Sequence, residues 1–152
     1  MPAIVVFLSL LGLVPFVVFG LGAVGHIPET AERMLIGLID YAALILAFAG
    51  GVHWGLALLP AAARPALRFG AGVLPLIVAW MGLVLAQMVS PWMALAVLIL
   101  GYLATVLTEH RAARRLLVPS GYVWIRWGFS MVAVVMMVMV LVLRGTGQTI
   151  VF

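Results

Sequence analysis

DYAALILAFAGGVHWGLA, residues 40–57, is the stretch of sequence that decides the fold class of this chain. It forms the centre of an apolar segment, residues 35–59, that is long enough to cross a bilayer as a helix, which needs about 20 mostly apolar residues. Two ionisable side chains interrupt it, Asp40 near its start and His53 in its second half. Because ionisable groups at membrane depth are costly, both residues are functional candidates.

The composition of the whole chain indicates an integral membrane protein. Of its residues 67% are hydrophobic and only 8% are charged, and its mean hydropathy is +1.35. Soluble domains are usually about 45–50% apolar and about 25% charged. We interpret the net charge of +4, which arises from arginine alone, as topogenic charge rather than a nucleic-acid surface. The absence of cysteine excludes disulfides, thiolate metal sites and cysteine nucleophiles.

Five apolar segments predict an all-α bundle of five transmembrane helices. Their approximate bounds are 3–25, 35–59, 67–89, 91–108 and 121–143, and the connections are too short for a second domain, so residues 1–152 form one transmembrane domain. Pro15 and Pro75 lie inside two of these segments. Each is expected to kink its helix, which membrane helices tolerate when neighbours satisfy the freed carbonyl.

The distribution of arginine predicts the orientation in the membrane. The side of the N terminus is expected to carry six arginines, Arg64, Arg68, Arg111, Arg114, Arg115 and Arg126. The other side carries two, Arg33 and Arg144, offset by Glu29 and Glu32. The positive-inside rule then places the N terminus in the cytoplasm and the C terminus in the periplasm of a bacterial inner membrane.

The segment 35–59 is predicted to lie at the centre of the bundle. A stripe of small residues spaced four apart favours close approach of another helix and comprises Ala43, Ala47, Gly51 and Gly55. At about 100° per residue, a bulky arc is expected to face lipid. That arc comprises Tyr41, Ile45, Phe48, Val52, Leu56 and Leu59. A further packed arc comprises Ala42, Leu46, Ala49, Gly50, His53 and Ala57.

A candidate polar site is predicted in the half of the membrane nearer the N terminus. It comprises His53, Trp54, Tyr102, Thr105 and Arg126, which come from three segments at one predicted depth. The alternative is structural: a hydrogen bond from His53 between helices, an Arg126 side chain that extends to the headgroups, and a Trp54 that packs at the interface.

Asp40 cannot belong to that site, because 13 residues separate it from His53, or roughly 20 Å along a helix. Its expected partners at the outer surface are Arg33, Gln87 and Arg144, and the alternative is an interfacial aspartate near a helix start.

Other features of the sequence do not assemble into a catalytic or metal centre. The three histidines are expected at three different depths, so they predict no metal site, and no cofactor can be assigned. No nucleophile or pair of carboxylates converges, which argues against an enzyme. Arg111, Arg114 and Arg115 are candidates for contact with anionic lipid, or they serve only as topogenic charge.

Several motifs resemble a known family along nearly the whole chain. They are LLGLVPF from Leu10, YAALILAFAGGVHWGLA from Tyr41, LP-x3-AW from Leu74 and P-x2-Y-x3-R from Pro119, with GGVHWG the most specific. The chain resembles the transmembrane protein 69-like family, domain-of-unknown-function family 3429. The resemblance implies an inner-membrane protein of five helices and implies no activity.

Three functions remain open from the sequence. The first is a non-enzymatic accessory or assembly factor of a membrane complex, for example a respiratory one, with other subunits or a second copy as partners beside the membrane lipids. The second is a small transporter or proton-linked channel that uses Asp40 and His53. The third is a module that binds lipid, quinone or haem near His53.

Overall fold

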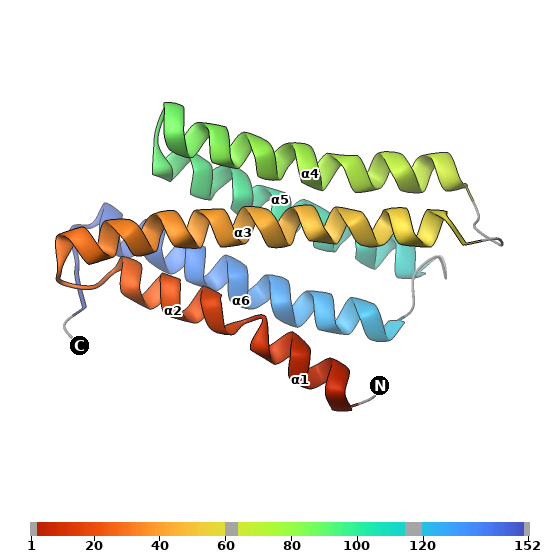
Figure 1. The fold of residues 1–152 in the computed structure, drawn as a ribbon, viewed down its shortest axis with the longest axis horizontal. Coiled ribbons are helices and arrows are strands. Elements are labelled where there is room, and N and C mark those ends of the chain that lie inside the picture. Colours follow the sequence, from red (N-terminus) through yellow and green to blue (C-terminus); the bar gives the residue numbers. More distant parts are fainter. Residues whose placement is uncertain (1–2, 60–63, 115–119, 151–152) are drawn as a thin grey trace.

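The computed structural model describes residues 3–59, 64–114 and 120–150. This part of the chain forms six helices (Figure 1): α1 (Ala3–Leu11), α2 (Val14–Ala23), α3 (Pro28–Ala57), α4 (Pro65–Met88), α5 (Pro91–Arg114) and α6 (Ser120–Gly145). Because α1 and α2 together make one span, the described residues contain five segments long and apolar enough to cross a membrane. The prediction of an all-α membrane bundle is confirmed.

The first span is broken rather than merely kinked. Its helix α1 ends at Leu11, and Pro15 lies in the first turn of α2. Proline is favourable there because its missing N–H needs no partner at a helix start. The hydroxyl of Tyr41 on α3 donates a 2.7 Å hydrogen bond to the carbonyl of Gly12, which satisfies backbone freed by the break. By contrast, α4 continues through Pro75.

Two helices are longer than the sequence pattern predicted. Helix α3 begins at Pro28 rather than at 35, with Pro28 in its first turn and Glu29 beside the positive end of the helix dipole. Helix α5 ends at Arg114 rather than at 108, with Arg111 and Arg114 in its last turn. The apolar pattern stops earlier in both cases because the extra turns carry charge. The extension of α5 makes Glu109 a helical residue.

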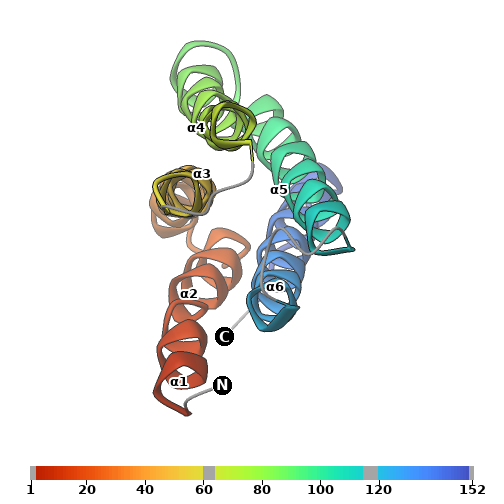
Figure 2. The same ribbon diagram turned by 90° about the vertical axis from the view of Figure 1, so that its right-hand side faces the viewer.

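Helix α3 is the central element, as predicted. It contacts α2, α4 and α5, and Figure 2 shows it between α2 and α4. The start of α1, the end of α3, the start of α4, the end of α5 and the start of α6 lie together at one end of the bundle (Figure 1). We call it the arginine-rich end, because Arg64, Arg68, Arg111 and Arg114 lie there.

Arg144 connects several helices at the opposite end of the bundle. Its guanidinium donates hydrogen bonds of 3.2 Å to the carbonyls of Ala23 and Ala31. It also forms a 2.6 Å ion pair with Glu32, and its Cζ lies 5.8 Å from the ring centroid of Trp92. One side chain of α6 thereby joins α2, α3 and α5.

The packed arc of α3 is buried as expected, whereas the other two faces agree with the prediction only in part: Phe48 and Leu59 of the bulky arc are exposed as predicted. All members of the arc that contains Ala42 and His53 are buried. Tyr41 of the bulky arc does not face lipid, because its ring meets Phe16 edge-on at 5.0 Å. The small-residue stripe does not pack along its length within this chain: Ala43 is buried and Ala47 half-buried, but Gly51 and Gly55 are exposed.

The close approach to another helix occurs at Gly50 instead of Gly51. A Cβ on Gly50 would collide with the carbonyl oxygen of Gly72 on α4, and a Cβ on Gly72 would lie 2.6 Å from the carbonyl oxygen of Gly50. The indole of Trp54 covers Gly72 and donates a 3.2 Å hydrogen bond from Nε1 to the carbonyl of Phe69. Two glycines and one tryptophan therefore set the crossing of α3 and α4.

The adjacent glycines Gly50 and Gly51 provide a matched test of this crossing. We expect Gly50→Ala to lower the free energy of unfolding by about 1–3 kcal/mol, as overpacking does. Gly51→Ala should leave it unchanged or slightly raised, because nothing lies within 4 Å of its added methyl group. Thermal unfolding in mild detergent measures both variants. Equal destabilisation would contradict the assigned crossing.

Candidate functional site

A buried carboxylate on α5, Glu109, contacts polar side chains from two other helices, α3 and α6. Its Oε2 accepts a 3.1 Å hydrogen bond and ion pair from Nε of Arg126. Its Oε1 accepts a 3.0 Å hydrogen bond from the hydroxyl of Tyr122 and lies 3.5 Å from Nε2 of His53. Glu109 is only 1% exposed, and Arg126 is 7% exposed. We call these four residues the Glu109 cluster.

Helical register brings the cluster together. Tyr122 and Arg126 are four residues apart on α6, so they lie on one face. His53 belongs to the buried arc of α3, and Glu109 follows the buried Thr105 by four residues on α5. The cluster therefore ties α3, α5 and α6 together near the arginine-rich end, within the membrane-spanning segments.

The Glu109 cluster is charge-balanced but leaves one donor unused. The carboxylate of Glu109 compensates the guanidinium of Arg126, which is the arrangement that buried charges require. Nη2 of Arg126 is buried and has no hydrogen-bond partner among the described residues. A buried N–H without an acceptor costs about 1–3 kcal/mol. The site can therefore accept one further hydrogen-bond acceptor without needing further negative charge.

The side chain of Arg126 also lines an apolar cavity of about 460 Å³. Tyr122 and Arg126 form the polar part of its wall, together with Ser9. Apolar side chains from α1, α3 and α6 form most of the remainder, including Leu8, Ile45, Phe48, Val52, Ile125 and Phe129. We call it the α1–α3–α6 cavity. It combines a lipid-like lining with a cationic hydrogen-bond donor.

Of the five residues predicted for the polar site, two meet in the cluster. His53 and Arg126 are joined through Glu109. Tyr102 is fully buried, but its hydroxyl donates a 2.9 Å hydrogen bond to the carbonyl of Ala42. Thr105 donates to the carbonyl of Gly101 within its own helix. Trp54 is 40% exposed and faces α4 rather than the cluster.

The sequence interpretation missed Glu109 and Tyr122. The apolar pattern predicted an end of this helix at residue 108, which left Glu109 in the connection that follows. The spacing of Glu109 could have indicated its position, since Tyr102, Thr105 and Glu109 follow the i, i+3, i+7 pattern of one helix face. Tyr122 lies one turn before Arg126 and could have been added by the same reasoning.

Asp40 lies apart from the cluster and from its expected partners. It is exposed on α3. Arg33 pairs instead with Glu29 at 2.7 Å, and Arg144 pairs with Glu32. None of the cavities described here is lined by both Asp40 and His53. The path between these residues that a channel would need therefore has no support from a described cavity.

Two of the three arginines predicted to contact anionic lipid lie at the surface. Arg111 and Arg114 are exposed, and Arg115 lies outside the described residues. Within the described ranges, no group of three or more His, Asp or Glu side chains is arranged to hold a metal ion.

A double-mutant cycle tests the coupling inside the cluster. Glu109→Gln or Arg126→Gln alone should each lower the free energy of unfolding by about 3–5 kcal/mol, because the partner charge stays buried without compensation. The double variant should lose clearly less than the sum of the two.

The measurement is thermal unfolding in detergent. Arg33→Gln, which removes an exposed ion pair, is the control and should cost less than about 1 kcal/mol. Additive losses in the double variant would contradict a coupled pair.

Comparison with known proteins identifies the family. The family model described as "Protein of unknown function (DUF3429)" matches residues 1–142, nearly the whole chain, so this protein belongs to that family. No curated protein and no solved structure matches the chain. The resemblance suggested by the sequence motifs is thereby confirmed for the family.

Proposed function

We propose that this member of the DUF3429 family is a non-enzymatic binding protein of the inner membrane whose ligand is an amphiphile with an uncharged polar end. The observation that carries the proposal is the buried Nη2 of Arg126, which has no partner while Arg126 lines an apolar cavity. By the positive-inside rule, the arginine-rich end faces the cytoplasm, so the ligand is held in the cytoplasmic half of the bilayer.

The chemistry of the α1–α3–α6 cavity defines the ligand class. Its apolar wall suits an acyl or isoprenoid chain, and its volume of about 460 Å³ lies within the usual range for small-molecule sites. At its polar part, Arg126 is already compensated by Glu109. An anionic head would add an uncompensated charge in a low-dielectric region, whereas a carbonyl oxygen adds only an acceptor. The ligand is therefore a quinone or an ester.

Extraction from the native membrane tests whether the cavity is occupied. We expect purified wild-type protein to carry a defined quinone or ester lipid that mass spectrometry detects. Val52→Trp should lose most of it, because the indole fills the cavity. Leu100→Trp is the control, since Leu100 is 65% exposed and lines none of the cavities described here. The same lipid content in all three proteins would contradict the proposal.

A matched pair of small ligands tests the preference for an uncharged head. Methyl laurate and laurate share one chain and differ chiefly in the charge of the head. A ligand that binds only the folded state raises the unfolding temperature. We expect methyl laurate to raise it more than laurate does in the wild type, and neither to raise it in Val52→Trp. A larger effect of laurate would contradict the assigned ligand class.

A second candidate function, an accessory or assembly factor of a membrane complex, is favoured by the exposed face of α3. Asp40 lies eight residues beyond Glu32, or about 12 Å deeper along the helix than the pair of Glu32 with Arg144. A carboxylate at the centre of a membrane helix costs about 2.5–3.5 kcal/mol on insertion scales. Gly51 lies within about 20° of Asp40 around α3, and a Cβ there has nothing within 4 Å. A neighbouring helix with a donor side chain would relieve this cost.

Because the natural chain has no cysteine, a single introduced thiol can report a neighbour on that face. Gly51→Cys should form adducts with another membrane protein when a thiol-reactive photo-cross-linker is used in native membranes. Gly128→Cys on α6 is the control, because its site is equally open. Adducts of equal yield at both positions, or at neither, would contradict an accessory role for the α3 face.

A further inference from the structure

The seam between α5 and α6 is hollowed along much of its length, on a different side of α6 from the α1–α3–α6 cavity. Two cavities of about 490 and 340 Å³ follow one another along both helices from the arginine-rich end, and a third of about 450 Å³ adjoins the second but is lined by α6 alone. Trp127 lines both the first and the second, and Val134 and Val135 line both the second and the third. The first two cavities, which α5 and α6 line together and which share Trp127, form one elongated groove, which we call the α5–α6 groove.

The groove has a cationic mouth. Its first cavity is lined by His110, Arg114, Trp124 and Trp127, and the ring centroids of His110 and Trp127 lie 6.0 Å apart. In the described part of the chain, no carboxylate forms an ion pair with Arg114. Tryptophan is enriched at the headgroup level of membrane proteins. The mouth therefore offers an uncompensated positive charge at the depth where lipid phosphates lie.

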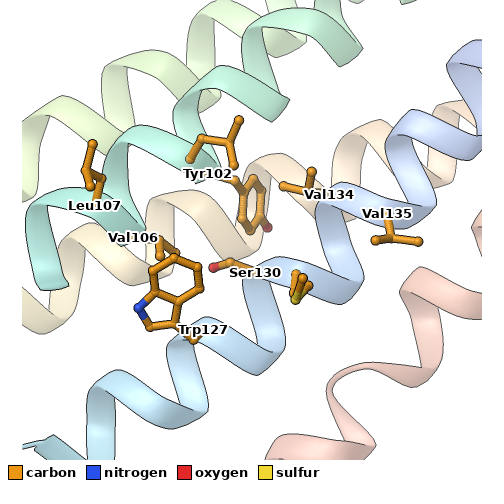
Figure 3. Close-up of a pocket in the computed structure, with 9 residues that line it drawn as sticks. Tyr102, Val106, Leu107, Trp127, Ser130, Val134 and Val135 are labelled. Carbon is orange, nitrogen blue, oxygen red and sulfur yellow. The ribbon is translucent and has the colours of Figure 1, made fainter.

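The remainder of the groove is apolar apart from the side chains of Tyr102 and Ser130. Figure 3 shows its middle part, where Val106 of α5 lies beside Trp127 of α6, and Tyr102 of α5 lies beside Ser130 and Val134 of α6. From Trp124 to Val135 the groove runs along eleven residues of α6, or about 16 Å. One leaflet contributes about half of the hydrocarbon thickness of about 30 Å. The length of the groove thus matches one acyl chain that extends from a headgroup toward the bilayer centre.

We propose that the α5–α6 groove is a binding site for one anionic phospholipid, whose phosphate is held by Arg114 and whose acyl chain lies along α6 from Trp127 to Val135. Charge distinguishes this site from the α1–α3–α6 cavity. There Glu109 neutralises the arginine and an uncharged head fits, whereas here the arginine carries no carboxylate partner and an anionic head fits. Of Arg111 and Arg114, which both lie in the last turn of α5, it is Arg114 that lines the groove. This proposal does not depend on the proposed function.

Quenching of tryptophan fluorescence by brominated lipids tests the site. The protein is reconstituted into phosphatidylcholine vesicles that contain a small fraction of brominated phosphatidylglycerol or, separately, of brominated phosphatidylcholine. We expect the anionic lipid to quench more at equal mole fraction, and unbrominated phosphatidylglycerol to compete. Trp127→Phe should remove most of this difference, because Trp127 lines the groove.

Two arginine variants that each remove one positive charge distinguish a specific lipid-binding site from a general electrostatic attraction between the protein and anionic lipid. Arg114→Gln should lower the preference for phosphatidylglycerol about fivefold, the effect expected of one basic residue near a membrane surface. Arg114→Lys should keep most of it. Arg64→Gln is the control, since Arg64 is exposed at the same end but on α4. Equal losses in Arg64→Gln and Arg114→Gln, or no preference in the wild type, would overturn the proposal.

Discussion

The carboxylate of Glu109 is the constraint on which the arginine-rich half of the structure depends. A buried carboxylate must be paired and hydrogen-bonded, and Glu109 obtains its partners from α3 and α6 while it projects from α5. The contact that satisfies it therefore fixes three helices in register. Inside a membrane the hydrophobic effect does not drive helices together, so polar contacts and contacts between small residues determine more of how the helices pack. The Glu109 cluster supplies the polar contact, and Gly50 with Gly72 supplies the small-residue contact.

The same pairing determines what the arginine can do. Arg126 donates from Nε to Glu109, its Nη2 has no partner among the described residues, and its side chain lines the α1–α3–α6 cavity. A neutralised arginine favours a carbonyl oxygen, and the solitary Arg114 at the mouth of the α5–α6 groove favours a phosphate. We therefore expect the α1–α3–α6 cavity and the α5–α6 groove to differ in the head-group charge that they accept, because Arg126 has a carboxylate partner and Arg114 forms no ion pair in the described part of the chain.

Much of this fold could be predicted from the sequence, and the exceptions have physical reasons. Apolar length predicted the five spans, and the angular pattern of residues 42–57 predicted the buried arc that carries His53 and Gly50. Helix ends were misjudged at Pro28 and Arg114, because turns that leave the bilayer lose the apolar pattern without ceasing to be helical. That error hid Glu109, which stands one residue beyond the predicted end of its helix.

The site itself was only partly predictable. Depth alone brought together His53, Tyr102 and Arg126, but depth cannot tell which side chains face one another. The hydroxyl of Tyr102 donates a hydrogen bond to a backbone carbonyl of α3, and the indole of Trp54 donates one to a backbone carbonyl of α4. The stripe of small residues is buried at Ala43 but exposed at Gly51 and Gly55, because Gly50, next to the predicted Gly51, contacts the neighbouring helix.

An experimental structure of the protein purified from its native membrane would test the central claim most directly. The account predicts elongated density in the α1–α3–α6 cavity that ends within hydrogen-bond distance of Nη2 of Arg126, with Nε still paired to Glu109. A cavity closed by Phe48 and Val52, with Nη2 bonded to a carbonyl of the protein, would contradict it.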